Sequence, residues 1–383
     1  MLKLLTIVGA RPQFIKAAAI SREIKNSCAN SVEELLIHTG QHYDKEMSEV
    51  FFSEMEIPAP AFNLGIGSGR HGEQTGEMIK QLEKVFLQEK PDGVIVYGDT
   101  NSTLAGALAA AKIFLPVIHI EAGLRSFNKQ MPEEINRIHT DHVSTLLFSP
   151  TPTGIENLKK EGKTTNPTPP FTIDHPGIFH SGDIMYDNNI YFRKKAEQSS
   201  SILEVVGIKD HPYVLATVHR PSNTDSSENL TGILSALHAI AEKMKVKVVL
   251  PLHPRTSKIL ESLSDQQLVR KITSHKDIHF VPPVTYLDMI NLEMNSELIL
   301  TDSGGVQKEA WFMKKPVIIL RDETEWTEIT DSGNGLLTGT DSASIFNAAE
   351  NYLNNPPSEF PAIFGSGNAA REIMEIITTT EWK

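Results

Sequence analysis

Short apolar runs recur along the chain, and longer amphipathic stretches separate them. In the first half these runs span residues 2–8, 34–39, 93–98, 116–121 and 145–148. A strand that is buried on both faces has a nearly continuous apolar sequence, because it has no face left for polar side chains. Strands of this kind that alternate with helices indicate a parallel sheet covered by helices on both faces. We therefore expect an α/β fold.

The pattern is interrupted once and then restarts, which indicates two domains. Residues 163–182 are rich in proline and threonine and are typical of a loop near a domain boundary. Apolar runs return at residues 213–218, 246–251, 297–301 and 316–320. A chain of 383 residues is also longer than one ordinary domain. We predict α/β domains over residues 1–175 and 176–363, followed by a last helical segment within 364–383.

The composition narrows the classes of partner. The formal net charge is −12, so a general attraction to nucleic acid is not expected. Cys28 is the one cysteine; it can form neither an internal disulfide nor a thiolate zinc cage, and it suits a reducing cytoplasm. The opening residues lack the length and cleavage site of a signal peptide, and no run approaches a membrane span. We expect a cytoplasmic protein without nucleic-acid or membrane partners, in which a small anion can still bind in a locally basic cleft.

The first apolar run leads into the motif VGARPQFIKAA, which predicts a strand, a glycine turn and a helix that opens with Pro12. Arg11 follows the carboxyl end of the strand, where open α/β sheets bind ligands, and Lys16 lies one turn into the helix. The N–H groups at the helix start and these two cations together suit an anion. Taken alone, the motif is slightly better explained as a capped helix with two solvated cations.

Polar residues follow further strands of the predicted first sheet. Asp99 lies in VYGDTNST, Glu121 lies in HIEAGLRS, and Gln41 and His42 lie in TGQHYD. Asp99 by itself is most simply the N-cap of the next helix, and a single histidine is more often a satisfied surface or core group. Because the carboxyl ends of parallel strands meet at one edge of a sheet, we expect Arg11, Asp99 and Glu121 to converge on one crevice.

Two clusters of histidine and arginine follow strands of the second half. His219 and Arg220 lie in TVHRPSN, and His253 and Arg255 lie in PLHPRT. A basic rim without a ligand is the plainer explanation for either cluster. Their occurrence at successive strand ends favours an anionic ligand.

The segment LTDSGGVQKEAW carries the sharpest local signal. A strand is followed by Ser303, Gly304 and Gly305 and then by a helix, with Glu309 further along it. Two glycines allow close approach of the backbone, the helix start offers N–H groups to phosphate, and a carboxylate can hold two ribose hydroxyls. The spacing of neither a Walker loop nor a GxGxxG motif is present. A nucleotide diphosphate bound without magnesium fits best.

Metal ligation is the competing explanation for the histidines and acids. The sequence contains no HExxH and no CxxC motif, and the acids are spread over separate strand ends beside arginines. We therefore expect no metal.

Taken together, these motifs resemble the non-hydrolysing UDP-N-acetylglucosamine 2-epimerase family. The similarity covers nearly the whole chain through GARPQFIK, TGQH, YGDTNST, HIEAGLRS, MPEEINR, SGDIMYD, TVHRPSN, TDSGGVQKEA and RDETEW, in this order. The resemblance implies two Rossmann-like domains with parallel sheets that face across a cleft, the glycosyltransferase-B architecture. It also implies a last helix that crosses back toward the N-terminal domain, and a homodimer.

The resemblance also implies a reaction and the residues that perform it. Members of the family invert C2 of a UDP-sugar by eliminating UDP to a 2-acetamidoglycal and adding it back, without NAD or a metal. The family's catalytic acids match Asp99, Glu121 and Glu133, and its catalytic histidine matches His219. The expected substrate-binding residues are Arg11, Lys16, Gln41, His42, Arg137, Arg220, His253, Arg255, Ser303, Gly304, Gly305, Glu309, Arg321 and Asp322.

Within this set, Arg11, Lys16 and Ser303 match positions that bind the diphosphate, and Glu309 matches the carboxylate that binds the ribose. The N-terminal domain would then carry the catalytic acids and the C-terminal domain would bind UDP. Glu134 points about a quarter-turn away from Glu133 on the same helix, and we expect it to be a structural partner for an arginine.

The chain departs from the commonest form of the family in several places. Gln13 stands where that form has glutamate, and Tyr97 stands where it has histidine. Several motifs are closer to a sister branch that epimerises UDP-2,3-diacetamido-2,3-dideoxyglucuronate. The C6 carboxylate of that substrate would suit a spare arginine, for which Arg255 is the candidate. The substrate therefore stays open between UDP-N-acetylglucosamine, which gives UDP-N-acetylmannosamine, and this uronate.

Other functions stay open at this point. A hydrolysing relative would release UDP and free N-acetylmannosamine, a UDP-sugar-binding module would not turn over, and a glycosyltransferase would share the fold. The acids argue against the last two, because neither needs opposed proton donors and acceptors on the N-terminal side. We expect a role in precursors of bacterial surface polysaccharide such as lipopolysaccharide O-antigen, and the sequence does not decide whether a second UDP-sugar acts as an activator.

Overall fold

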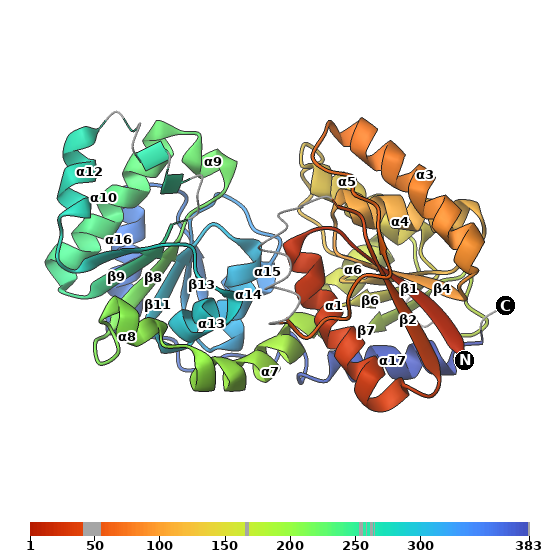
Figure 1. Ribbon diagram of the computed structural model, residues 1–383. Coiled ribbons are helices and arrows are strands. Elements are labelled where there is room, and N and C mark those ends of the chain that lie inside the picture. Colours follow the sequence, from red (N-terminus) through yellow and green to blue (C-terminus); the bar gives the residue numbers. More distant parts are fainter. Residues whose placement is uncertain are drawn as a thin grey trace. The chain divides into compact units, whose positions relative to one another are not determined.

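The chain forms two compact units. The computed structural model describes residues 1–40, 55–164, 168–252, 256–257, 259–260, 263 and 265–381. The first unit comprises Met1–Asn188 and Ala362–Lys383, and the second comprises Asn189–Pro361 (Figure 1). No helix in the described part of the chain is both long enough and apolar enough to cross a membrane.

The first unit is built on a parallel sheet. Its strands are β1 (Leu2–Val8), β2 (Val32–His38), β3 (Phe62–Asn63), β4 (Gly93–Tyr97), β5 (Val117–Ile120), β6 (Leu146–Ser149) and β7 (Gly177–His180). Among the described residues the strand order is β3-β2-β1-β4-β5-β6-β7, and each neighbouring pair runs parallel. The predicted parallel sheet is therefore confirmed.

Helices cover both faces of this sheet (Figure 1). They are α1 (Arg11–Glu23), which continues into the π-helix η1 (Ile24–Cys28), α3 (His71–Glu89), α4 (Asn101–Lys112), α5 (Pro132–Val143), α6 (Pro152–Lys160) and α17 (Ala369–Thr379). Helix α7 (Ile184–Ser199) begins in the first unit and continues into the second. Helices α3, α4 and α5 pack side by side, and α1 packs against α17 from the other end of the sequence. This layering is the consequence of strands that are apolar on both faces.

The alanine-rich helix α4 lies close to the sheet. Ala105 and Ala109 are fully buried in the same apolar cluster as Ile7 and Val96. A Cβ added at Gly106 would lie 3.1 Å from Val96 and 3.2 Å from Ile7. Small side chains on α4 therefore bring its first turn, and the β4–α4 loop before it, close to the strand ends that carry the candidate site.

The second unit repeats this plan. Its strands are β8 (Tyr213–Thr217), β9 (Lys247–Pro251), β10 (Ile278–Val281), β11 (Leu298–Thr301), β12 (Val317–Ile319) and β13 (Gly335–Leu337). Its helices are α8 (Ile202–Val206), α9 (Pro221–Thr224), α10 (Ser227–Met244), α12 (Gln266–Thr273), α13 (Tyr286–Asn295), α14 (Gly304–Phe312), α15 (Thr327–Asp331) and α16 (Ser342–Asn354). In the described residues the strand order is β10-β9-β8-β11-β12-β13, again parallel throughout.

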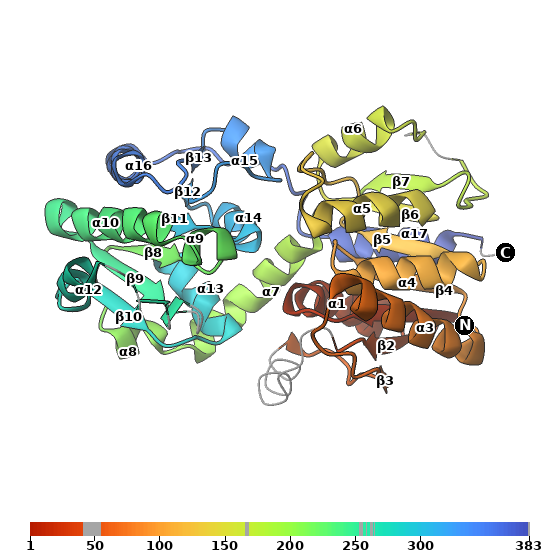
Figure 2. The same cartoon turned by 90° about the horizontal axis from the view of Figure 1, so that it is seen from above.

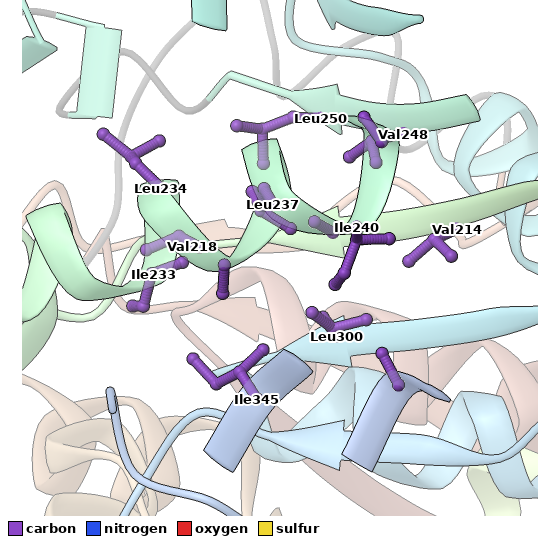
Figure 3. Packing of buried hydrophobic residues seen from close by; sticks show 14 of the residues in the cluster. Val214, Val218, Ile233, Leu234, Leu237, Ile240, Val248, Leu250, Leu300 and Ile345 are labelled. Carbon is purple, nitrogen blue, oxygen red and sulfur yellow. The ribbon is translucent and has the colours of Figure 1, made fainter. Parts of the chain in front are cut away.

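The core of the second unit joins α10, α16 and the central strands. Helix α10 packs against α16 and over β9 (Figure 2). Leu237 and Ile240 of α10, Val214 of β8, Leu300 of β11 and Ile345 of α16 are fully buried and point toward one another (Figure 3). Burying each of these side chains contributes on the order of 2 kcal/mol, so this cluster holds the two helices to the sheet.

Each sheet reverses its strand order at one point. In the first unit β2 and β3 lie on one side of β1, and β4 to β7 lie on the other. In the second unit the reversal lies between β8 and β11. Loops diverge from the carboxyl ends of strands at such a reversal, and this leaves a crevice where open α/β sheets bind ligands.

The predicted loop at residues 163–182 is wrong in its last part. Residues Gly177–His180 form β7, which pairs in parallel with β6 at the edge of the sheet. Ile178 and Phe179 are the only large apolar side chains of β7, and two such residues within a segment rich in proline and threonine are too short an apolar run to be recognised as a strand. The edge strand β13, with three residues, escaped prediction for the same reason.

Asp187 ties the carboxyl-terminal helix to the first unit. Its carboxylate accepts hydrogen bonds from the backbone N–H groups of Ala369 (3.1 Å) and Ala370 (2.8 Å), at the start of α17. Burial raises the pKa of Asp187 to about 6; the two backbone hydrogen bonds oppose this shift, and neighbouring Asp183 adds to it. A protonated Asp187 is therefore favoured more in the folded protein than in the unfolded chain.

This shift predicts a pH dependence of stability. The pKa of Asp187 rises from 3.8 to about 6 on folding, so its contribution is fully present below about pH 4 and is lost as the pH rises through about 6. The loss is about 3 kcal/mol, from about 1.4 kcal/mol per pK unit. Residue 187 of an Asp187→Asn variant cannot titrate. The difference in free energy of unfolding, variant minus wild type, should therefore rise by about 3 kcal/mol between pH 4 and pH 7 when both proteins are unfolded in urea. The exposed Asp174→Asn variant should show a constant difference from the wild type, and a constant difference for Asp187→Asn would contradict the prediction.

Candidate active site

Three predicted site residues follow neighbouring strands at the reversal point of the first sheet. Arg11 opens α1 after β1, Asp99 follows β4, and Glu121 follows β5. Strand β4 pairs with both β1 and β5, so all three residues lie at the same edge of the sheet. Lys16 and Arg137 reach this edge from α1 and α5. The structure thus brings together residues that are up to 126 positions apart.

Glu121 is held by Lys16. The two side chains form a close ion pair, with 9% of the Glu121 side chain and 11% of the Lys16 side chain exposed. Glu121 adopts the left-handed backbone conformation, with φ of 75°, which turns the chain directly after β5. Opposite charges that are this far removed from water attract one another more strongly than an exposed pair does.

Gly98 is required beside this pair. It has φ of 61°, and a Cβ added to it would lie 2.9 Å from Lys16 Nζ and 3.0 Å from Glu121 Oε2. Any other residue would be strained by the left-handed conformation and would also push against the ion pair.

His119 fixes the turn at Gly98 from below. The ring is fully buried; its Nδ1 lies 2.7 Å from the Asp141 carboxylate and its Nε2 lies 2.8 Å from the Gly98 carbonyl oxygen. Both partners are hydrogen-bond acceptors, and the ring bridges the Asp141 carboxylate and the Gly98 backbone. Asp141 also pairs with Arg125 at 2.7 Å. Burial alone would raise the pKa of Asp141, but His119 and Arg125 hold it below its usual range.

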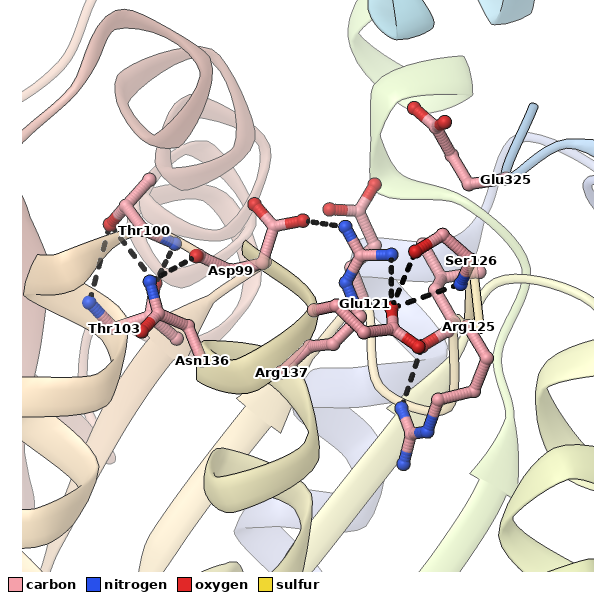
Figure 4. Close-up of polar contacts among 12 residues, drawn as sticks. Asp99, Thr100, Thr103, Glu121, Arg125, Ser126, Asn136, Arg137 and Glu325 are labelled. Carbon is pink, nitrogen blue, oxygen red and sulfur yellow. Dashed lines mark hydrogen bonds and ion pairs between the residues drawn. The ribbon is translucent and has the colours of Figure 1, made fainter. Parts of the chain in front are cut away.

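Asp99 is held by Arg137. The guanidinium pairs with the Asp99 carboxylate through Nη2 and with Glu134 through Nη1, at 3.1 Å (Figure 4). Glu134 is buried and also accepts hydrogen bonds from the backbone N–H groups of Ser126 and Phe127, both at 2.9 Å. The prediction that Glu134 is a structural partner of an arginine is confirmed. Glu133, the predicted catalytic acid beside it, is exposed in the first turn of α5.

Gln13 joins the ends of β1 and β4. Its side-chain oxygen accepts hydrogen bonds from the N–H groups of Gly9 (2.9 Å) and Ala10 (3.1 Å), and its nitrogen donates to the Tyr97 carbonyl oxygen (3.2 Å) and to Thr103 Oγ1 (3.0 Å). An amide can accept and donate at once, whereas an ionised carboxylate only accepts. Gln13, which stands where the commonest family form has glutamate, therefore uses both ends of its amide to fix the backbone at the reversal point.

The second unit carries a His–Asp pair at its own reversal point. Asp302 follows β11 and is fully buried; it accepts hydrogen bonds from the backbone N–H groups of His219 and Arg220, each at 3.0 Å, and its Oδ1 lies 3.1 Å from His219 Nδ1. Burial alone would raise the pKa of Asp302, but His219 and these backbone groups hold it below its usual range. The His219 side chain is 42% exposed, so Asp302 orients a histidine that solvent can reach.

Helix α14 begins beside this pair with the predicted glycines. Ser303 caps the helix by accepting a hydrogen bond from the Val306 N–H at 3.4 Å. Arg321 is buried and Arg220 is half-buried, and both pair with Glu325, Arg321 at 3.0 Å and Arg220 at 4.0 Å. A helix start and arginines are groups that proteins commonly use to bind an anion.

Glu309, on the same helix, lies against a second buried carboxyl group. Burial raises the pKa of Glu293 well above its usual range, and Glu309 raises it further. Glu293 is fully buried on α13, so the fold places a carboxyl group with a raised pKa beside Glu309.

Some predicted residues add nothing to this geometry. Gln41, His42, His253 and Arg255 lie outside the described residues. Asp322 is exposed beside Arg321. Their roles stay predictions.

One cluster in the described residues has ligand atoms close enough for a metal ion, namely His238, Glu242 and His275. His275 Nε2 lies 3.0 Å from the Glu242 carboxylate, and its Nδ1 accepts a hydrogen bond from the Asp277 N–H at 3.2 Å. The acceptor role of Nδ1 places the proton of a neutral ring on Nε2, which then donates to Glu242. The cluster is thus explained as a hydrogen-bonded His–carboxylate pair.

Sequence reasoning missed the residues that support the site. His119 lies on β5, two positions before Glu121, and a histidine so near a candidate site residue was a signal that could have revealed it. Asp141 and Arg125 carry no such signal, because their contacts with His119 and with each other join β5, α5 and the loop between them. Asp302 stands beside Ser303 in a motif already recognised, but only the fold shows that it orients His219.

Comparison with known proteins places these features in a family. The family model described as UDP-N-acetylglucosamine 2-epimerase matches residues 24–378. A UDP-N-acetylglucosamine 2-epimerase homolog of Methanococcus maripaludis is 49% identical over 98% of this chain and 99% of its own length. The UDP-2,3-diacetamido-2,3-dideoxy-D-glucuronate 2-epimerase of Pseudomonas aeruginosa is 45% identical over 98% of this chain and 99% of its own. The crystal structure of Methanocaldococcus jannaschii UDP-GlcNAc 2-epimerase in complex with UDP-GlcNAc and UDP matches with a TM-score of 0.86 and 42% identity, over 98% of this chain and 99% of that one.

The geometry at Gly98 predicts the effect of a single methyl group. Gly98→Ala should lower the free energy of unfolding by about 1–2 kcal/mol, because alanine is strained in the left-handed conformation and its Cβ meets Lys16 and Glu121. Urea denaturation measures this loss. Gly76→Ala is the matched control, because Gly76 is exposed within α3 with open space around it, and there the methyl group should stabilise by about 0.5–1 kcal/mol. Equal effects of the two substitutions would contradict the proposed constraint at Gly98.

Proposed function

Because the chain belongs to the UDP-N-acetylglucosamine 2-epimerase family, and is thus an isomerase acting on carbohydrates, we propose that it interconverts UDP-N-acetylglucosamine and UDP-N-acetylmannosamine. The observation that carries this proposal is the pair of carboxylates, Glu121 and Asp99, each held by a cation at the reversal point of the first sheet. Inversion at C2 needs a group that removes a proton and another that returns it on the opposite face, and carboxylates can do both.

The proposed reaction proceeds by elimination and re-addition. A base takes the proton from C2, the C1–O bond breaks, and UDP leaves with the bonding electrons, giving a 2-acetamidoglycal. A proton then adds to C2 from the other face, and UDP adds back at C1. Bonds and electrons balance without an oxidant, so no cofactor is required and UDP remains bound between the two steps.

We assign the proton transfers to Glu121, Asp99 and Glu133, together with His219. Lys16 neutralises Glu121 and would also attract the diphosphate, so the charge that develops on the leaving group can draw the ammonium away from the base. Asp302 orients His219 in the same way that a carboxylate commonly orients a catalytic histidine.

We further propose a division of roles between the domains. Residues 1–175 carry the catalytic acids with Arg11 and Lys16, residues 176–363 bind UDP, and the last helix belongs with the N-terminal domain. The start of α14 with Ser303, Gly304 and Gly305 suits the diphosphate, and Glu309, further along the same helix, suits the ribose hydroxyls. Gln41, His42, Arg137, Arg220, His253, Arg255, Arg321 and Asp322 complete the proposed binding set.

UDP-2,3-diacetamido-2,3-dideoxyglucuronate is the second candidate substrate. The Pseudomonas aeruginosa relative with this name is 45% identical to the chain over nearly its whole length, which matches the motif forms noted in the sequence. A C6 carboxylate would require one cation more than N-acetylglucosamine does, and Arg255 is proposed for that role. We also propose a cytoplasmic homodimer that supplies precursors of surface polysaccharide.

Solvent exchange tests the reaction and the substrate together. The protein is incubated in deuterated water with each of the two UDP-sugars and followed by NMR. We expect deuterium at C2 of one of them, together with its C2 epimer, while UDP stays attached to the sugar. Accumulation of free UDP in step with free sugar would instead identify a hydrolysing enzyme. Binding without exchange of either sugar would refute the catalytic proposal.

The same assay tests Glu121. Glu121→Gln keeps the shape of the side chain but cannot take a proton, so C2 exchange should fall at least about 100-fold. Glu33→Gln, an exposed change of the same charge on β2, should exchange at the wild-type rate. Thermal unfolding of both variants checks that they are folded, and full exchange by a folded Glu121→Gln variant would remove Glu121 from the mechanism.

A further inference from the structure

The start of α14 is already occupied by a negatively charged group from the protein itself. A Cβ added at Gly304, the first residue of α14, would lie only 2.2 Å from Oε1 of Glu325. The carboxylate of Glu325 therefore rests against the first turn of the helix, where the helix dipole favours an anion. Gly304 allows this approach because it has no side chain.

Two arginines complete the surroundings of this carboxylate. Arg321 Nη1 lies 3.0 Å from Glu325 Oε2, and Arg220 Nη2 lies 4.0 Å from Glu325 Oε1. The Glu325 side chain is 13% exposed. A helix start and two guanidinium groups are the partners that proteins commonly use for phosphate, and here they meet a carboxylate.

We infer that Glu325 is an internal competitor for the diphosphate, so that UDP binds by displacing its carboxylate from Arg321 and from the start of α14. This inference rests on the proposed function, which assigns the diphosphate to that position. Glu325 would then lower the affinity for UDP without contacting the bound UDP.

The segment that carries Glu325 is suited to such an exchange. Residues 321–326 lie between β12 and α15 outside any helix or strand, so the side chain can turn away without breaking a regular element. The segment itself stays anchored to α14, because Thr324 donates a hydrogen bond to Gln307 at 2.6 Å and Lys308 lies over the Trp326 ring at 4.3 Å. Displacement therefore needs movement of one side chain, and Arg321 changes its anionic partner.

UDP should displace the Glu325 carboxylate, but the competition reduces the net affinity of the protein for UDP. A diphosphate carries more negative charge and more acceptor oxygens than Glu325, so it can win the helix start and the arginines. The binding-competent arrangement exists only for the fraction of time that Glu325 is turned away, and the apparent dissociation constant is raised by that factor. Loss of the Glu325 charge should therefore tighten binding of phosphate-bearing ligands and leave other ligands unaffected.

Calorimetric titration of the full chain with UDP, uridine and inorganic pyrophosphate tests this inference. For Glu325→Gln we expect UDP and pyrophosphate to bind about tenfold more tightly than to the wild type, with uridine unchanged. Glu325→Ala should act in the same direction and keeps the test valid if the amide retains contacts of its own. Glu350→Gln, an exposed change of the same charge on α16, should leave all three affinities at wild-type values.

The outcomes separate this inference from the function on which it rests. Wild-type protein that binds UDP while both Glu325 variants bind it equally or more weakly would overturn the role of Glu325 alone. A gain for uridine equal to the gain for UDP would also overturn it, because the effect would not depend on phosphate. Failure of the wild type and of Glu350→Gln to bind UDP at all would overturn the proposed function, and the inference with it.

Discussion

Charges gathered at the carboxyl end of a buried parallel sheet have to be balanced by the protein, and the first unit is organised around this requirement. His119, Arg125, Glu134, Arg137 and Asp141 are buried near the strand ends, where an unpaired charge is costly. Lys16 balances Glu121, Arg137 pairs with Asp99 and Glu134, and His119 and Arg125 pair with Asp141. His119, Glu134 and Asp141 also form hydrogen bonds with backbone groups of the loops that follow β4 and β5, so these paired side chains help to fix the geometry of the site.

Both units contain a His–Asp pair, and the exposure of the histidine differs between them. In each, a buried aspartate lies beside a histidine near the point of strand reversal: Asp141 with His119, and Asp302 with His219. His119 is fully buried and its second nitrogen is taken by the Gly98 carbonyl, so it can only hold the turn. His219 is 42% exposed, so the same partner leaves it available for chemistry. Exposure, and not the pairing itself, distinguishes the structural histidine from the candidate catalytic one.

The strands and the residues at their ends could be predicted from the sequence, because local patterns indicate them. Side-chain contacts between residues that are distant in the sequence could not. Continuous apolar runs identified β1, β4 and β11, and with them the places of Arg11, Asp99 and Ser303 at strand ends. The edge strand β7 was missed because its sequence contains only two large apolar side chains and lies in a segment rich in proline and threonine. The partners of the site, such as Asp141 and Glu325, were missed because nothing in their local sequence indicates what they touch. Glu134 is the opposite case. Its pairing with an arginine could be predicted because Arg137 lies three residues away on the same helix.

Both units therefore hold cations that are expected to bind diphosphate already paired with carboxylates, Lys16 with Glu121 and Arg321 with Glu325. Binding of UDP to such a surface is an exchange of one anion for another, and its net free energy is a difference between two similar attractions. A reaction that releases UDP at C1 and then uses it again would gain from this arrangement. Unpaired cations would hold the diphosphate most tightly after C1–O cleavage and would thus raise the barrier to re-addition. Carboxylates that compete for the same cations lower this barrier.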